Sequence, residues 1–154
     1  MVAQLNLSLE TVEHIYTSDS LIVRPDATVR DVFQQMKVSK RGATLVCDGE
    51  ALLGIFTERD ALKLMANEVE LDGPIAEVMT KDPVVMGLND TVGKATAKMS
   101  FGGYRRLPIV DEAGQPQGFV KASDVLHYLV AHFPAVVYNL PPSPHHSTKE
   151  REGA

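Results

Sequence analysis

Hydrophobic residues recur along the first part of the chain with two different periods, which predict strands and helices in alternation. The apolar run at residues 21–23 stops before Pro25, as a short strand does. After Thr28, apolar residues follow at the 3.6-residue spacing of a helix, at positions Val29, Val32, Phe33 and Met36. Asp31 stands three residues after Thr28, which predicts a cap at the start of this helix.

A hairpin and a second helix are expected next. Residues 43–47 are rich in strand-forming side chains, Asp48-Gly49 is typical of a tight turn, and residues 52–56 supply the returning strand. A helix then runs from Glu58 to about Met65, with Leu62 and Met65 expected to face inward. The predicted order is strand, helix, strand, strand, helix.

The same pattern occurs twice, because residues separated by 63 positions match along most of the chain. One inserted residue later changes the offset to 64. The matched pairs include Thr17 and Thr80, Thr28 and Thr91, Met36 and Met99, Gly54 and Gly118, and Asp60 and Asp124. The two copies span about residues 11–67 and 74–132, with the second expected to place its strands and helices at residues 84–86, 91–101, 106–110, 117–120 and about 122–131.

Each copy is too short to bury a large core alone, so the two are expected to pack on each other as one α/β (α+β) module. Residues 133–154 differ in composition, because they are rich in proline, include His145 and His146, and end in a charged run. This tail is expected to be extended or loosely attached. No further ligand accompanies the two histidines at a metal-binding spacing, so no metal site is predicted.

Composition narrows the classes of function. The 154 residues are 44% hydrophobic and 23% charged, and no apolar run approaches the roughly 20 residues of a membrane-spanning helix. The N-terminus carries no export signal, which favours a cytoplasmic protein. A net charge of −5 argues against a nucleic-acid partner, since Arg105 and Arg106 beside Tyr104 form only an isolated basic patch. Cys47 is interpreted as a packing residue.

The segment from Gly54 to Asp60 runs directly from a predicted strand into a helix start. The free N–H groups of that first turn and the helix dipole favour an anion such as a phosphate. Thr57 and Arg59 can donate hydrogen bonds to the same phosphate, and Asp60 can accept from ribose hydroxyls. Gly54 leaves room for a flat base against the strand. Together these residues predict a nucleotide site.

A second interpretation of Thr57 and Asp60 needs no ligand. The two residues also form a capping pair, in which each side chain satisfies backbone donors of its own helix. Such a cap stabilises the fold by about 1 kcal/mol. If Asp60 turned onto its own main chain and side chains filled the gap, a nucleotide site would lose its basis.

The repeated motifs resemble a tandem pair of CBS domains, also called a Bateman module. The resemblance rests on Tyr16-Thr17, on residues 78–84 and 105–111, and on the two glycine-led strand-to-helix junctions, and it covers about residues 11–132. It implies two copies related by a pseudo-twofold axis, with their sheets packed face to face. It also implies two clefts that commonly bind adenosine-containing ligands, among them AMP, ADP, ATP and S-adenosylmethionine, and a module that senses rather than catalyses.

The resemblance also implies roles for individual residues. In the first cleft, Thr17 would contact the base or ribose, Thr57 the phosphate and Asp60 the ribose hydroxyls. Arg105 and Arg106 precede a strand of the opposite copy, where basic residues often reach the phosphate, and the planar arginine fork suits two phosphate oxygens. The alternative for these two arginines is a solvated pair flanking a strand.

The second predicted cleft departs from this pattern. Thr80 and Asp124 are kept, but Lys121 stands at the position of Thr57, and Ser123 precedes Asp124. Lys121 either favours a more phosphorylated ligand or is a solvent-facing strand end, and both alternatives stay open at this point.

No motif sets a nucleophile beside a base, so no catalytic residue is predicted. His127 and His132 lie five residues apart, which misses the spacing of a helical metal pair. The preferred hypothesis is a regulatory module that binds an adenine nucleotide, needs no other cofactor, and acts on an unidentified protein. The alternative is a homodimerisation or scaffold module with vestigial sites, and a homodimer is expected under both, through the helix residues Leu62, Leu64, Met65, Val125, Leu126, Leu129 and Val130.

Overall fold

The computed structural model describes residues 9–132, which fold into four α-helices, seven strands and two short 3-10 helices. The tail predicted at residues 133–154 lies outside the described residues. The elements are η1 (Val12–His14), β1 (Leu21–Val23), α1 (Val29–Ser39), β2 (Ala43–Asp48), β3 (Ala51–Thr57), α2 (Glu58–Ala66), η2 (Ile75–Glu77), β4 (Thr80–Lys81), β5 (Met86–Gly87), α3 (Val92–Gly102), β6 (Arg106–Val110), β7 (Pro116–Lys121) and α4 (Ala122–His132).

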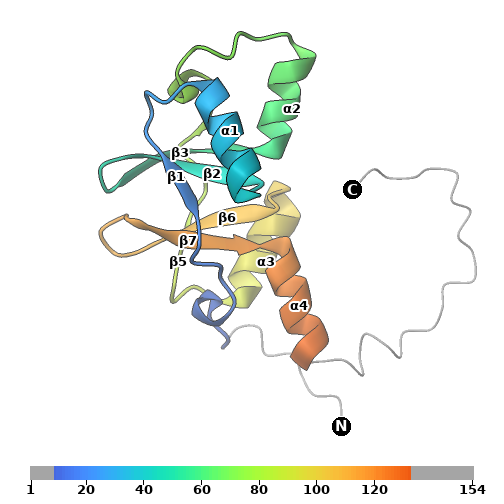
Figure 1. Ribbon diagram of the computed structural model, residues 1–154. Helices are drawn as coiled ribbons and strands as arrows, with labels where there is room; N and C mark the ends of the chain where they lie inside the picture. Colours follow the sequence, from blue (N-terminus) through green and yellow to red (C-terminus); the bar gives the residue numbers. More distant parts are fainter. Residues whose placement is uncertain (1–8, 133–154) are drawn as a thin grey trace, which may run out of the picture.

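The strands form two sheets, one in each half of the molecule (Figure 1). The first has the order β1-β2-β3-β4, in which β1 runs parallel to β2 and the other pairs are antiparallel. The second has the order β5-β6-β7, with β5 parallel to β6 and β6 antiparallel to β7. In each half, a parallel strand, a helix, a hairpin and a second helix follow one another, as the repeated sequence pattern predicts.

The segment that leads into each repeat pairs with the sheet of the other repeat. Strand β4 belongs to the second repeat by sequence but pairs with β3 of the first, where Thr80 lies opposite Ile55. In the same way, Thr17 pairs with Phe119 in β7, and the two residues exchange N–H···O bonds of 2.8 and 3.0 Å. The two repeats are therefore joined by an exchange of their leading segments.

This exchange also completes the two hydrophobic cores. Val12, from the first repeat, is fully buried in the core of the second, beside Val92, Leu107 and Val120. Ile75, its equivalent 63 residues later, is fully buried in the core of the first repeat. Neither repeat has its full core without the other, so the two form one structural unit.

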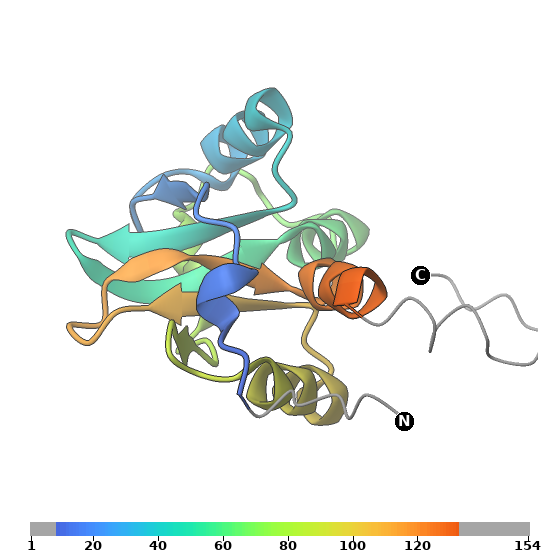
Figure 2. The ribbon, with the colours of Figure 1, turned by 90° about the horizontal axis from the view of Figure 1, so that it is seen from below.

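The two sheets pack face to face between the helices (Figure 2). The contact is made by Ala43, Leu45, Cys47 and Ile55 of the first sheet and Phe119 of the second. Cys47 is buried here, and burial raises the pKa of its thiol because the thiolate loses its solvation. The predicted α/β architecture with sheets packed on each other is confirmed, and Cys47 is a packing residue.

The helix starts follow the capping residues expected from the sequence. The N–H of Asp31 donates to the hydroxyl of Thr28 at 3.1 Å, and the N–H of Lys94 donates to Thr91 at 3.0 Å. Each cap satisfies a donor that the first turn of a helix leaves without a partner. The predicted start of α1 is confirmed.

The inward face predicted for the helix after β3 is wrong. Leu62 and Met65 in α2 are 70% and 64% exposed, whereas Ala61 and Leu64 pack against the core. Both pairs are three residues apart, so helical spacing alone does not distinguish them. The small side chain of Ala61 lets α2 approach the core on that face. The predicted strand at residues 84–86 also shortens, because β5 begins only at Met86.

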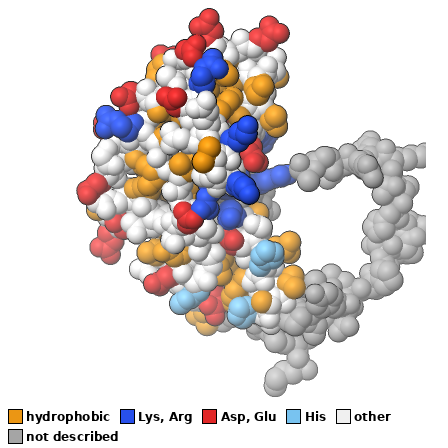
Figure 3. All heavy atoms as spheres, viewed as in Figure 1, with side chains coloured by type: hydrophobic (Ala, Val, Ile, Leu, Met, Phe, Trp, Pro, Cys, Tyr) orange, Lys and Arg blue, Asp and Glu red, His pale blue; other side chains and the backbone are white. Residues whose placement is uncertain are grey.

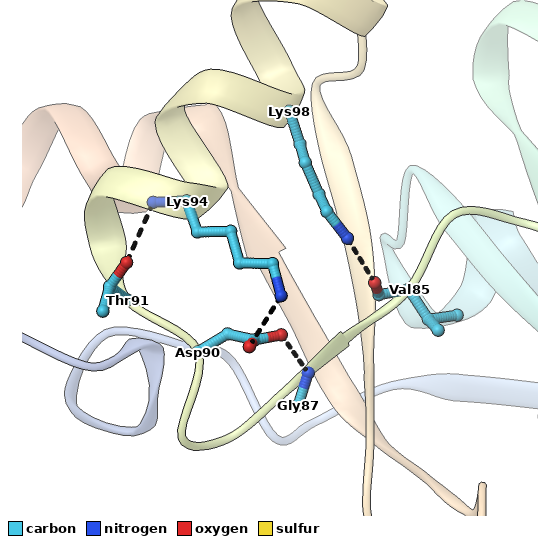
Figure 4. Close-up of polar contacts among 6 residues, drawn as sticks. All are labelled: Val85, Gly87, Asp90, Thr91, Lys94 and Lys98. Carbon is cyan, nitrogen blue, oxygen red and sulfur yellow. Dashed lines mark hydrogen bonds and ion pairs between the residues drawn. The ribbon is translucent and has the colours of Figure 1, made fainter. Parts of the chain in front are cut away.

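A polar network before α3 occurs in the second repeat alone, since Ala27 stands at the equivalent of Asp90 (Figure 4). The Asp90 carboxylate accepts a hydrogen bond of 2.8 Å from the Gly87 N–H and one of 3.0 Å from the Lys94 ammonium. Partial burial by itself would raise the pKa of Asp90, but the Gly87 N–H and the Lys94 and Lys98 charges outweigh it and lower that pKa.

Candidate ligand-binding cleft between the repeats

The junction between β3 and α2 forms a capping box. The Asp60 carboxylate accepts from the N–H of Thr57 at 3.0 Å and from its hydroxyl at 3.1 Å, while that hydroxyl accepts from the N–H of Asp60 at 3.4 Å. The capping interpretation of these two residues is therefore confirmed. Both bonds that the carboxylate accepts use Asp60 Oδ2, and Oδ1 has no hydrogen-bond partner within residues 9–132. The Thr57 hydroxyl is engaged by its own helix.

The equivalent junction between β7 and α4 is less self-contained. The Asp124 carboxylate accepts from the N–H of Lys121 at 2.9 Å, which repeats the bond between Asp60 and Thr57. Lys121 has no hydroxyl, so in the described part of the chain no side chain accepts from the N–H of Asp124. The start of α4 therefore keeps one more free backbone donor than the start of α2, which favours an anion there.

The two glycines that lead these junctions make room for backbone. A Cβ on Gly54 would lie 2.5 Å from Sδ of Met79 and 2.7 Å from the carbonyl oxygen of Thr80. Gly118 has a φ of +151°, and a Cβ there would overlap the carbonyl group of Thr17. The room that the sequence assigned to a flat base beside Gly54 is thus taken by the leading segment of the other repeat.

The structure groups the leading threonines differently from the sequence prediction. Thr17 was expected beside Thr57 and Asp60, but it lies on β7, next to the junction that holds Lys121. Thr80 lies on β3, next to the junction that holds Thr57. Each leading threonine thus belongs with the strand-to-helix junction of the other repeat, because the leading segments are exchanged.

A cavity of about 150 Å³ lies between the repeats. Thr17 and Lys121 line it together with Arg106, and we call it the Lys121 cleft. Its other lining residues are Asp19, Ser20, Leu21, Lys40, Arg41, Gly42, Ala43 and Phe119. The leading segment and the α1–β2 turn of the first repeat therefore face β6 and β7 of the second.

The Lys121 cleft is strongly basic. Its lining includes the cations Lys40, Arg41, Arg106 and Lys121, with Asp19 as the only carboxylate. Figure 3 shows Lys and Arg side chains gathered at mid-height on this face, where the two repeats meet. Asp19 forms an ion pair with Arg41, and its side chain is 73% exposed. Lys40, Arg106 and Lys121 have no ion-pair partner within residues 9–132.

Two further features prepare this cleft for a polar ligand. Arg106 donates to the carbonyl oxygen of Gly42 at 3.4 Å, and a Cβ on Gly42 would lie 2.7 Å from the Arg106 guanidinium. Gly42 thus allows an arginine of one repeat to lie against the backbone of the other. The hydroxyl oxygen of Ser20 is buried without a hydrogen-bond partner in the described structure, and Ser20 lines the cavity. An unpartnered buried hydroxyl is costly unless a ligand or water engages it.

The other predicted site residues lie outside the cavity lining. Arg59, Arg105 and Ser123 are exposed, and the carbonyl oxygen of Arg105 accepts from the first N–H of α4 at 2.8 Å. Their roles toward a ligand remain predictions.

The region around Thr57, Asp60 and Thr80, which we call the Thr57 junction, carries no cations at the positions equivalent to those of the Lys121 cleft. These equivalents are Gly103, Tyr104, Ala43 and Thr57.

The sequence prediction missed Asp19, Ser20, Lys40 and Arg41. A signal for two of them exists, because Lys40 and Arg41 lie just before β2, much as Arg105 lies just before β6 and Arg106 begins it. Neither a group of three metal-ligating side chains nor a helix of membrane-spanning length and hydropathy occurs within residues 9–132.

Comparisons with known proteins agree with this architecture. The family model described as "CBS domain" matches residues 12–67 and 75–131. An uncharacterized 17.7 kDa protein of Acidianus ambivalens is 32% identical over 120 residues, which are 77% of this chain and 73% of that protein. The Arabidopsis thaliana protein CBSCBSPB5 is 37% identical over 105 residues, covering 66% of this chain but only 19% of the plant protein.

Solved structures repeat the fold. A CBS domain protein from Pyrobaculum aerophilum, solved in complex with AMP, superposes with a TM-score of 0.70 at 21% identity. The match covers 79% of this chain and 98% of that protein. The duplicated sequence, the paired sheets and the two matched domains together mean that this chain belongs to the CBS-domain family, as a pair of CBS domains.

Proposed function

We propose that this chain is a regulatory module that binds an adenine nucleotide in the Lys121 cleft and passes that signal to a partner protein. The observation that carries the proposal is the cavity between the repeats. Its lining joins Lys121, the residue directly before α4, to Lys40 and Arg106, and none of these three cations has an ion-pair partner within residues 9–132. Phosphate is the anion that such a combination suits, because backbone N–H groups and arginine forks both match its oxygens. The AMP complex of the Pyrobaculum aerophilum protein supports an adenosine ligand.

The acid at the helix start supplies the second half of the recognition. Asp124 keeps one carboxylate oxygen on the N–H of Lys121, which holds the side chain in place. Its other oxygen has no hydrogen-bond partner within residues 9–132 and would accept from the ribose hydroxyls. Asp124 stands three residues after Lys121, which lines the cavity together with Thr17. Binding would hold both repeats together, because ligand groups would contact residues of each.

A ligand panel tests this function. Thermal unfolding with AMP, ADP, ATP, S-adenosylmethionine and NAD is expected to show stabilisation by an adenosine phosphate, of about 4 kcal/mol at a thousandfold excess over the dissociation constant. Asp124→Ala is expected to remove most of that shift, measured against the melting temperature of the same variant without ligand. Asp60→Ala is the matched control and should keep it. No shift with any ligand, or an equal shift in Asp124→Ala, would contradict the proposal.

A homodimer is a compatible second proposal, favoured by two exposed leucines. Leu62 on α2 and Leu126 on α4 occupy equivalent positions in the two repeats and are 70% and 58% exposed. Paired apolar positions of this kind suit a symmetric interface between copies of the chain. Light scattering of Leu62→Glu and Leu126→Glu is expected to show loss of the dimer. A monomeric wild-type protein would refute it, and a dimer without any nucleotide binding would favour the scaffold alternative.

A further inference from the structure

The cations of the Lys121 cleft exceed what a single phosphoryl group needs. Arg106 and Lys121 belong to the second repeat, where they pair across β6 and β7, and the Arg106 side chain reaches the Gly42 carbonyl of the first repeat. Lys40 and Arg41 belong to the turn between α1 and β2 of the first repeat. The cleft therefore draws positive charge from both repeats, while the equivalent residues at the Thr57 junction are uncharged.

One of these four cations is already occupied. The carboxylate of Asp19 pairs with the guanidinium of Arg41, whose side chain is 33% exposed. Asp19 itself is mostly exposed, so its pair with Arg41 is weak and is easily exchanged. A phosphoryl group carries more negative charge than a carboxylate and offers more acceptor oxygens, so it can replace Asp19 at Arg41.

From this geometry we infer that the Lys121 cleft selects nucleotides by their number of phosphoryl groups, with nucleoside di- and triphosphates preferred over monophosphates. Asp19 is then a built-in competitor, which neutralises Arg41 until a second phosphoryl group displaces it. This inference rests on the proposed nucleotide-binding function and adds a basis for specificity to it. Arg106, Lys121 and the start of α4 serve the first phosphoryl group, and Lys40 and Arg41 serve the next.

Variants of Arg41 and of Asp19 test two statements separately: that the cleft prefers ATP over AMP, and that Asp19 competes with a phosphoryl group for Arg41. Calorimetric titration with AMP, ADP and ATP at constant ionic strength, with a chelator to remove divalent cations, is expected to show an affinity for ATP at least tenfold above that for AMP. Arg41→Gln should reduce the affinity for ATP to nearly that for AMP. Arg24→Gln is the matched control, since Arg24 pairs with Asp26 outside the cleft, and it should leave the preference intact.

The competitor role has its own matched pair of variants. Asp19→Asn is expected to raise the affinity for ADP and ATP severalfold and to change that for AMP much less. Asp82→Asn alters the equivalent residue of the second repeat, which has a φ of +48° that asparagine tolerates, and it should change neither. Thermal unfolding of each variant without ligand verifies that it folds.

The outcomes distinguish this inference from the proposed function. If AMP binds as tightly as ATP, or if Asp19→Asn weakens ATP, the inference is overturned while nucleotide binding stands. If no adenosine phosphate binds, the proposed function fails and the inference fails with it. If inorganic tripolyphosphate competes with ATP in the wild type but not in Arg41→Gln, the selection by phosphoryl number is supported.

Discussion

The two strand-to-helix junctions share one plan and differ at one decisive position. In both, an aspartate at the helix start accepts from the N–H of the last strand residue, at 3.0 Å for Asp60 and 2.9 Å for Asp124. Thr57 adds a hydroxyl that closes its own cap, whereas Lys121 leaves the cap open and adds a charge. The same fold thus supports a self-satisfied helix start in one repeat and an anion-ready one in the other.

The glycines that lead the junctions should differ most in their tolerance of a side chain. Gly118→Ala combines an unfavourable φ with overlap of the Thr17 backbone, so we expect it to lower the free energy of unfolding by about 4 kcal/mol. Gly54→Ala should cost about 2 kcal/mol, because the flexible Met79 side chain can move in part. Gly114→Ala, in open space at a φ of +84°, is the control and measures backbone strain alone. Denaturant unfolding gives all three values, and equal losses would contradict the close approach at Gly118.

Removal of an exchanged core residue tests whether the repeats are energetically one unit. Ile75→Ala empties a fully buried position in the core of the first repeat and should cost about 3 kcal/mol. Val12→Ala, at the equivalent position in the second core, should cost somewhat less because fewer atoms are removed. Both variants should unfold in a single transition followed by circular dichroism. Two separate transitions would mean that the repeats fold independently.

The two capping aspartates should contribute unequally to stability without ligand. Asp60→Ala removes bonds to both the N–H and the hydroxyl of Thr57, and we expect a loss of about 1.5 kcal/mol. Asp124→Ala removes a single bond to Lys121 and should cost about 1 kcal/mol or less. Melting temperatures in buffer without nucleotide measure the difference. A larger loss in Asp124→Ala would contradict the comparison of closed and open caps.

The smallest expected effect comes from the network before α3. The pKa of Asp90 is lowered in the folded state, so its ionised form stabilises the protein above the ordinary aspartate value of about 4. That contribution is lost as pH falls through the lowered folded value. Asp90→Asn should therefore cost less than about 1 kcal/mol at pH 7, with a difference from wild type that shrinks toward pH 3. Asp72→Asn, in an exposed pair with Arg30, is the control, and an undiminished difference at pH 3 would contradict the ionic role of Asp90.

Local patterns predicted the helices and hairpins well because each depends on neighbours in the chain. The cap at Thr28 and the turn at Asp48-Gly49 are set by hydrogen bonds and backbone angles within a few residues. The buried face of α2 was predicted wrongly, because Leu62 and Leu64 are both apolar and only the position of the core decides between them. Burial of a helix face is a tertiary property. In α2, the spacing of the apolar residues did not reveal which face is buried.

The candidate site also combines residues that the sequence identified with an arrangement that only the fold supplies. The duplicated motifs identified Thr17, Arg106, Lys121 and Asp124 as residues of interest, but not which of them meet. The exchange of leading segments placed Thr17 with Lys121, and the packing of the two repeats on each other brought Lys40 and Arg41 into the same cleft. The hydroxyl of Thr57, assigned to a phosphate from the sequence, is bonded to Asp60 instead.

The sequence by itself determined that this protein contains two equivalent α/β repeats and that each has an acid at a helix start, because an offset of 63 residues relates like residues without reference to space. Only the tertiary structure decided how the repeats are joined and where the cations gather. Two repeats have the same sequence pattern whether each leading segment pairs with the sheet of its own repeat or with the sheet of the other repeat. The burial of Val12 and Ile75 in opposite cores is the physical feature that separates these two arrangements.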